Sequence, residues 1–103
     1  MSRITTHILD LSLGRPAGDV EIVLFFGEAE IVRGRTHTDG RLGGWDVGGG
    51  VYKLRFETKA YFSRQSVVSL YPFVEVHFEV GEEGHYHIPL LLSPWGYSTY
   101  RGS

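Results

Sequence analysis

Histidine is the residue type in this chain best suited to acid–base chemistry near neutral pH. The 103 residues include five histidines and no cysteine, and the unperturbed pKa of imidazole lies close to neutrality. His85 and His87 are two residues apart in an extended segment, so both side chains point to one face of a strand. His7 lies among the apolar neighbours Ile8 and Leu9, where a single histidine is more often structural. The residues alone do not show which histidines act.

Alternating histidines also allow a metal-binding interpretation. His85 and His87 could share one zinc ion with a third imidazole such as His7, because zinc accepts histidine nitrogens. The sequence offers no carboxylate or fourth ligand that would define an open catalytic position. We therefore expect a working site without a metal. Whether these three histidines take up adventitious zinc stays open.

Two glycine-containing segments bear on the choice of site. Arg41 follows the turn sequence Thr38-Asp39-Gly40 and so begins a strand beside a tight reversal; taken alone, it indicates a solvated arginine. The run from Gly43 to Gly50 lacks the spacing, the following helix and the lysine of a phosphate-binding loop. We expect this run to be a flexible connection between strands.

Alternation of apolar and polar residues predicts a β protein. In Phe73–Val80 the even positions are apolar and three of the four odd positions are polar, as in a strand with one solvated face. Val20–Phe26 and Glu30–Arg35 form a second pair, joined by a short connection that favours a hairpin. Val51–Glu57 alternates as well, whereas Lys59–Gln65 does not and is expected to form a short helix.

The C-terminal segments complete the predicted β structure. His85–Leu92 reads as a strand that is apolar on both faces, so we expect the His87 face to meet another subunit. Pro89 removes a ladder hydrogen bond and favours an edge or interface position. A turn at Ser93–Gly96 lets Tyr97–Arg101 pair back antiparallel. Seven or eight short strands of this kind predict an all-β sandwich forming one domain over residues 1–103.

The composition of the chain limits the classes of partner and of chemistry that it can have. Ten basic and 12 acidic residues give a formal net charge of −2, and the absence of like-charge runs disfavours nucleic acid and anionic membranes as partners. Without cysteine there are no disulfides and no thiolate chemistry. The start lacks the apolar core of a signal peptide and no segment resembles a membrane span, so we expect a cytoplasmic protein. A chain this small has a modest core and is a candidate for oligomerisation.

Four segments together resemble a known family. They are Ile4–Asp10, Gly14–Ala17, Thr38–Arg41 and the closing run from His85 to Ser103, HYHIPLLLSPWGYSTYRGS. Their order and spacing resemble the 5-hydroxyisourate hydrolases, the transthyretin-related enzymes of urate breakdown. The resemblance covers nearly the whole chain and is most specific in the closing run.

The resemblance implies a fold and an assembly. It implies a transthyretin-like (prealbumin) sandwich of two four-stranded sheets with one short helix. It also implies a homotetramer, a dimer of dimers, with active sites in the channel between dimers.

The resemblance also implies a reaction. This is the hydrolytic ring opening of 5-hydroxyisourate to 2-oxo-4-hydroxy-4-carboxy-5-ureidoimidazoline without a cofactor. His7 and His87 would share water activation and proton transfer, with the acid and the base not distinguished, and Arg41 would stabilise the developing oxyanion. The tail residues Tyr100, Arg101 and Ser103 would bind substrate, Tyr100 as an aromatic wall and Ser103 through its carboxylate.

Two other interpretations remain. A transthyretin-like sandwich could carry a small ligand or a partner without turning it over, since a fold does not fix a function. Arg41 and a terminal Ser103 argue against a carrier, which needs neither. A purely structural β domain would leave the apolar His87 face and the tail unexplained.

Overall fold

The computed structural model describes all 103 residues. Nine strands and one helix follow one another along the chain. Their bounds are β1 Ser2–Asp10, β2 Arg15–Pro16, β3 Glu21–Phe26, β4 Ala29–Arg35, β5 Arg41–Val47, β6 Gly50–Phe56, α1 Thr58–Ser63, β7 Val74–Val80, β8 Gly84–Ser93 and β9 Gly96–Thr99. No helix is long and apolar enough to cross a membrane.

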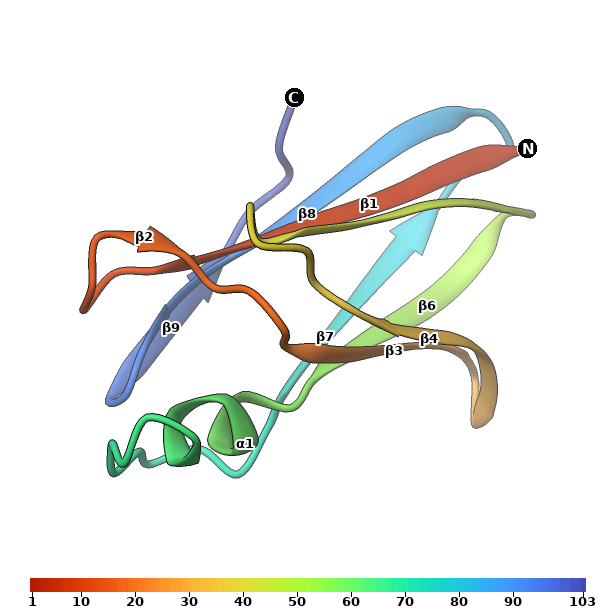
Figure 1. Cartoon of the computed structure of the whole chain (residues 1–103). Coiled ribbons are helices and arrows are strands. Elements are labelled where there is room, and N and C mark those ends of the chain that lie inside the picture. The colour runs from red at the N-terminus through yellow and green to blue at the C-terminus, as the bar shows by residue number, and fades with distance from the viewer.

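The strands form two sheets that face each other across a common core (Figure 1). One sheet has the order β2-β1-β8-β9, with β5 also paired to β1, and the other has the order β4-β3-β6-β7. The helix α1 lies at one end of the sandwich. The predicted sandwich with one short helix is confirmed. The first sheet carries one strand more than predicted, the two-residue β2.

The core holds the two sheets together. Seventeen buried side chains form one cluster between the layers, including Ile4 and Ile8 of β1, Leu54 of β6 and Leu90 of β8. Each fully buried aliphatic side chain contributes about 1.5–3 kcal/mol, whereas an exposed ion pair contributes about 0–1 kcal/mol. Burial of apolar surface therefore dominates the stability, and the outer faces are free to carry polar function.

One buried carboxylate ties β1 to α1. Asp10 is 1% exposed and accepts hydrogen bonds from the Tyr61 hydroxyl at 2.6 Å and from the Ser12 and Leu13 amides at 2.9 and 3.1 Å. Burial alone would raise the pKa of Asp10, but these hydrogen bonds outweigh it and hold the pKa below its ordinary value of 3.8. The end of β1 is thereby fixed against the helix.

Pro89 was predicted to lie at an edge or at an interface. Strand β8 is internal, so the edge alternative is wrong, and the interface alternative stays a prediction. The strand pairs with β1 in parallel and with β9 antiparallel. The backbone groups of His87 and Pro89 face the same neighbour, and there β9 ends at Thr99 and pairing resumes only at Gly102. The missing N–H of Pro89 therefore falls at a gap in the ladder.

The glycine run is also different from the prediction. Gly43 and Gly44 belong to β5, and only Gly48 and Gly49 connect β5 to β6. Gly43 has φ +124°, and a Cβ there would lie 2.7 Å from the Cα of Thr5. The glycine is needed because β5 approaches β1 closely at a bulge between Ile4 and Thr5.

Candidate active site

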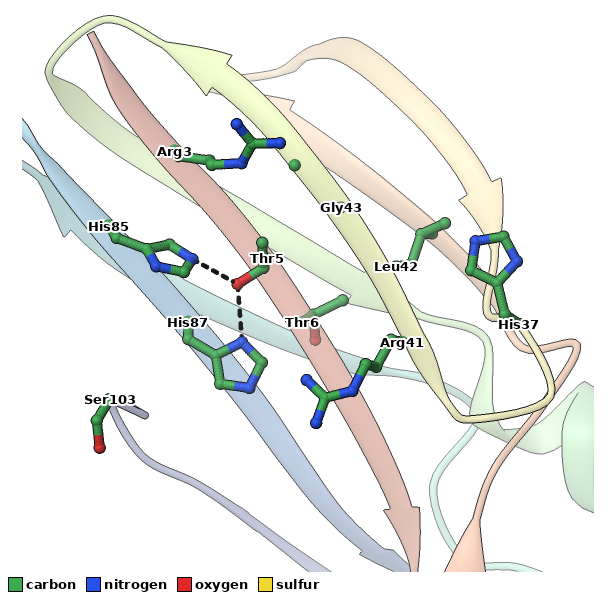
Figure 2. Close-up of a pocket in the computed structure, with 11 residues that line it drawn as sticks. Arg3, Thr5, Thr6, His37, Arg41, Leu42, Gly43, His85, His87 and Ser103 are labelled. Atoms are coloured by element: carbon green, nitrogen blue, oxygen red, sulfur yellow. Dashed lines mark hydrogen bonds between the residues drawn. The ribbon is translucent and has the colours of Figure 1, made fainter.

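A hollow of about 370 Å³ lies on the outer face of the first sheet (Figure 2). Strands β1, β5 and β8 supply most of the lining residues, and the tail contributes Ser103. The lining residues are Arg3, Thr5, Thr6, His37, Arg41, Leu42, Gly43, Gly44, His85, His87 and Ser103. Leu42 is the one hydrophobic residue among them, so the hollow is suited to a small polar ligand.

The register of β1 with its two neighbours builds this hollow. Thr5 of β1 stands opposite Gly43 of β5 and His87 of β8, and His7 stands opposite Arg41 of β5. Because Gly43 has no side chain, the space above Thr5 stays open. Figure 2 shows the Arg41 side chain extending from β5 across β1 toward the His87 ring.

Thr5 connects the two histidines of β8. Its Oγ1 lies 3.0 Å from His85 Nε2 and 2.8 Å from His87 Nδ1. Figure 2 shows the other ring nitrogen of His87 pointing away from Thr5. The hydroxyl thus fixes the orientation of the His87 ring and leaves Nε2 available to a ligand.

The surroundings of His87 favour its neutral form. Its half-buried position lowers the pKa below the ordinary value of 6.5, and the positive charges of Arg41, His7 and His85 lower it further. A neutral imidazole at physiological pH can accept a proton from water. His87 therefore has the properties of a general base.

His7 lies beside the hollow and does not line it. Its Nε2 is 2.7 Å from the Asp39 carbonyl oxygen. A carbonyl only accepts hydrogen bonds, so Nε2 carries a hydrogen and donates it. The turn before β5 thereby holds the ring of His7 next to Arg41, its register partner.

The arginines of the hollow have no carboxylate partner. None of the ion pairs in the molecule involves Arg3 or Arg41. The Arg41 backbone N–H donates to the Asp39 side chain at 2.9 Å, which fixes the start of β5 and leaves the guanidinium free. A free guanidinium can stabilise negative charge on a bound molecule.

The tail approaches the hollow from the β9 side. The Gly102 N–H donates to the His87 carbonyl oxygen at 2.8 Å, and Ser103 then reaches the hollow. Arg101 lies over the Tyr86 ring, 4.4 Å from its centroid, and donates to the His85 carbonyl oxygen at 3.3 Å. Pro89, which lies beside His87 on this face, is buried. The tail therefore covers part of the His87 face within one chain.

The structure separates the predicted site residues into groups. Arg41, His87 and Ser103 meet in the hollow, and His7 lies next to it. The remaining two, Tyr100 and Arg101, line a different hollow together with residues of β7. No group of three or more His, Cys, Asp or Glu side chains is arranged to hold a metal ion.

Thr5 and Arg3 line the hollow but were not among the predicted site residues. Alternation along β1 places Arg3, Thr5 and His7 on one face, and Thr5 also lies in the segment Ile4–Asp10 that resembles the family. That Thr5 would meet His85 and His87 depends on the parallel pairing of β1 with β8. No pattern in either strand specifies this pairing.

Comparison with known proteins identifies the family. A model of the HIUase/Transthyretin family matches residues 4–102. The chain belongs to this family. A family member from Schizosaccharomyces pombe, a probable 5-hydroxyisourate hydrolase, is 42% identical over 112 residues that cover 97% of this chain and 90% of that protein.

Solved structures of the family share the fold. The 5-hydroxyisourate hydrolase of Klebsiella pneumoniae superposes with a TM-score of 0.93 at 36% identity, covering 100% of this chain and 94% of that one. Sea bream transthyretin in complex with thyroxine gives a TM-score of 0.90 at 32% identity, covering 96% and 93%. The family therefore includes hydrolases and a thyroxine-binding protein on one sandwich.

Proposed function

We propose that this chain is a 5-hydroxyisourate hydrolase that opens the substrate ring to 2-oxo-4-hydroxy-4-carboxy-5-ureidoimidazoline in urate breakdown. One observation carries the assignment. In a polar hollow, an unpaired guanidinium, Arg41, lies across β1 from His87, an imidazole held neutral. Attack of water on a carbonyl needs both a base and a stabiliser for the developing oxyanion.

The alternative is a non-catalytic carrier, favoured by the similarity to thyroxine-bound transthyretin. Sites for large aromatic ligands are mostly apolar with a few polar groups. The hollow on the first sheet is mostly polar instead, because Leu42 is its one hydrophobic residue. The relatives that share 42% identity with this chain are also named as hydrolases.

In the proposed mechanism His87 is the base. Its Nδ1 is held by Thr5, so Nε2 receives the proton from the attacking water. A positioned acid–base group of this kind contributes about 10²- to 10⁴-fold in rate. Arg41 orients the substrate and stabilises the oxyanion that forms as the carbonyl is attacked.

His7 is the proposed proton donor to the leaving nitrogen. In its imidazolium form it keeps the Nε2 hydrogen on Asp39 and carries a second on Nδ1, which it can donate. Water, two imidazoles and a guanidinium are sufficient for this hydrolysis, so the proposed reaction uses no metal or other cofactor.

The tail has two proposed roles. Ser103 lines the hollow and contacts substrate directly. Arg101 anchors the tail through its contacts with Tyr86 and His85. Together with the hydrogen bond from Gly102 N–H to His87, these contacts hold Ser103 at the hollow. Tyr100 lies on the other hollow in one chain, so its contribution to substrate binding as an aromatic wall depends on assembly with other chains.

We propose a homotetramer, a dimer of dimers with the active sites in the channel between dimers. One end of the sandwich carries exposed apolar side chains, with Leu11 58%, Leu70 58% and Trp95 64% exposed. Hydrogen bonds from Leu11 N–H to Leu92 and from Leu70 N–H to Pro94 hold these segments together. We call these three residues the apolar end patch. Such a patch favours contact with another chain.

The proposed location is the cytoplasm, and the proposed functional unit is the single domain of residues 1–103. The fold is held by its core and hydrogen bonds without cysteine, so it does not need an oxidising compartment. Fractionation of the source cells tests this location directly.

The function is tested with freshly generated substrate. Urate oxidase produces 5-hydroxyisourate in the cuvette, and its ultraviolet decay is followed with and without this protein. We expect decay far above the spontaneous rate, with no added metal. Equal decay in both cuvettes would remove the hydrolase assignment and leave the carrier, whose thyroxine affinity is then measured by titration.

A further inference from the structure

Thr5 has one hydroxyl hydrogen and two imidazole partners. Its Oγ1 lies within hydrogen-bond distance of His85 Nε2 and His87 Nδ1. A hydroxyl can donate only one hydrogen, so Thr5 donates to one histidine and accepts from the other. The proton positions on the two rings are therefore not independent.

Two arrangements satisfy both bonds when the rings are neutral. In the first, His85 donates from Nε2 to Thr5, Thr5 donates to His87 Nδ1, and His87 carries its hydrogen on Nε2. In the second, His87 donates from Nδ1 to Thr5, Thr5 donates to His85 Nε2, and His87 Nε2 is a free lone pair. Only the second arrangement gives the base that the proposed function requires.

We propose that Thr5 is a positioning residue that holds His87 in its Nδ1–H tautomer and passes the Nδ1 proton on to His85 when His87 Nε2 takes a proton from water. This relay rests on the proposed hydrolase function. It assigns a role to Thr5, and it makes His85 the acceptor of the proton that leaves His87 Nδ1.

The environments of the two histidines give the relay its direction. His85 is exposed, whereas His87 is half-buried between β1 and the tail. A positive charge is better solvated at the exposed ring than at the half-buried one beside Arg41. Transfer through Thr5 spares His87 a charge that its surroundings disfavour.

The proton balance of the relay closes. Water loses a proton to His87 Nε2 as its oxygen bonds to the substrate carbonyl carbon. His87 Nδ1 gives its proton to Thr5 Oγ1, and the original Thr5 hydrogen moves to His85 Nε2. His87 and Thr5 end neutral and His85 becomes imidazolium. The starting state returns when His87 Nε2 releases its proton to solvent, His85 Nε2 gives a proton back to Thr5 Oγ1, and Thr5 gives its own hydrogen to His87 Nδ1.

The tautomers can be read without substrate. In protein labelled with ¹⁵N-histidine, long-range ¹⁵N–¹H correlation spectra distinguish protonated from unprotonated ring nitrogens. We expect His87 to be protonated on Nδ1 in the parent protein and in Thr5→Ser. We expect this preference to be lost in Thr5→Val, which has the same shape without the hydroxyl. An Nε2–H tautomer in the parent, or an unchanged tautomer in Thr5→Val, would overturn the proposal.

Kinetics test the proton transfer itself. Thr5→Val should lower kcat by about ten- to 100-fold with little change in KM. This loss is smaller than the about 10²- to 10⁴-fold contribution of a group that transfers the proton directly, because Thr5 acts through His87. Thr5→Ser should restore most of kcat. His85→Gln keeps a hydrogen-bonding group for Thr5 but cannot take up the proton, so it should lose kcat as well.

The outcomes separate the relay from folding and from the proposed function. Thermal melts identify a Thr5→Val protein that fails to fold, and His85→Gln then decides the kinetic question. Parent-like kcat in His85→Gln would overturn the relay. A parent protein that does not hydrolyse 5-hydroxyisourate would overturn the proposed function and the transfer step, while the tautomer spectra would still decide how Thr5 is bonded.

Discussion

At the scale of single residues, three histidines of one sheet face differ because of their neighbours. His85 is exposed and bonded to Thr5, His87 is half-buried beside it, and His7 is held by a backbone carbonyl. The sequence alone identified imidazole as the acid–base group but could not rank the three. Burial and the partner of each ring nitrogen decide the ranking, and both depend on contacts across strands.

The lowered pKa of His87 predicts the pH dependence of hydrolysis. A base must be unprotonated, so kcat/KM should fall as pH decreases through the His87 pKa. Burial and the positive neighbours lower this pKa, so the acidic limb of the profile should have its midpoint below 6.5. Initial rates of ultraviolet decay across buffers of constant ionic strength measure the profile.

Arg41→Gln is the matched variant for this profile. Removal of the guanidinium charge, one of the causes of the lowered pKa, should move the acidic limb to higher pH. The rate at the plateau should fall by about 10²- to 10³-fold, as for loss of one oxyanion donor. An acidic limb above 6.5 in the parent, or an unmoved limb in the variant, would contradict His87 as the base.

At the scale of elements, the tail depends on a close approach to β8. Gly102 pairs with His87, and a Cβ added at Gly102 would lie 2.5 Å from His87 Cδ2. Gly102→Ala must therefore displace the imidazole or the tail. Because misplacement by about 1 Å can cost about 100-fold in rate, we expect kcat to fall by that order. The free energy of unfolding should change by less than about 1 kcal/mol.

Gly96→Ala is the control for this variant. Gly96 also belongs to the closing segment, but an added Cβ there would have its nearest neighbour at 3.9 Å. Activity and denaturation midpoints are measured for both proteins under the same conditions. Parent-like turnover in Gly102→Ala would show that the tail does not need to lie against His87.

Most elements could be predicted from the sequence because their signals are local. Alternation gave β3, β4, β6 and β7, and the turn sequence before Arg41 gave the start of β5. The run from Gly43 was expected to be a connection between strands because glycine suits turn geometry. In the structure Gly43 lies in β5, where β1 comes so close that a side chain would not fit. The internal position of Pro89 was missed because it depends on a gap in the ladder to β9.

The hollow itself was only partly predictable, for a related reason. Arg41 and His87 came from a resemblance to a family, and nothing in their own strands indicates that they face each other. They meet because β1 pairs with β5 on one side and with β8 on the other. Thr5 belongs to the same contact, and although it lies in a segment that resembles the family, nothing in the sequence indicates that it meets His85 and His87.

At the scale of the whole molecule, the apolar end patch predicts assembly. Light scattering should report a tetramer at micromolar concentration. Trp95→Lys should shift it toward smaller species, because a charge placed in an apolar contact is costly to bury. Val51→Lys is the control, since Val51 is 54% exposed on β6 and lies outside the patch. A parent protein that remains monomeric at this concentration would contradict the proposed tetramer.

Hydrolysis of 5-hydroxyisourate is expected at the hollow around His87. The most direct test is kcat/KM for freshly generated 5-hydroxyisourate in the parent, His87→Ala and His77→Ala, since His77 is an exposed histidine on β7 in the other sheet. We predict a loss of about 10²- to 10⁴-fold for His87→Ala and parent-like turnover for His77→Ala, with both variants folded by circular dichroism. Full turnover in His87→Ala would show that hydrolysis does not depend on this hollow.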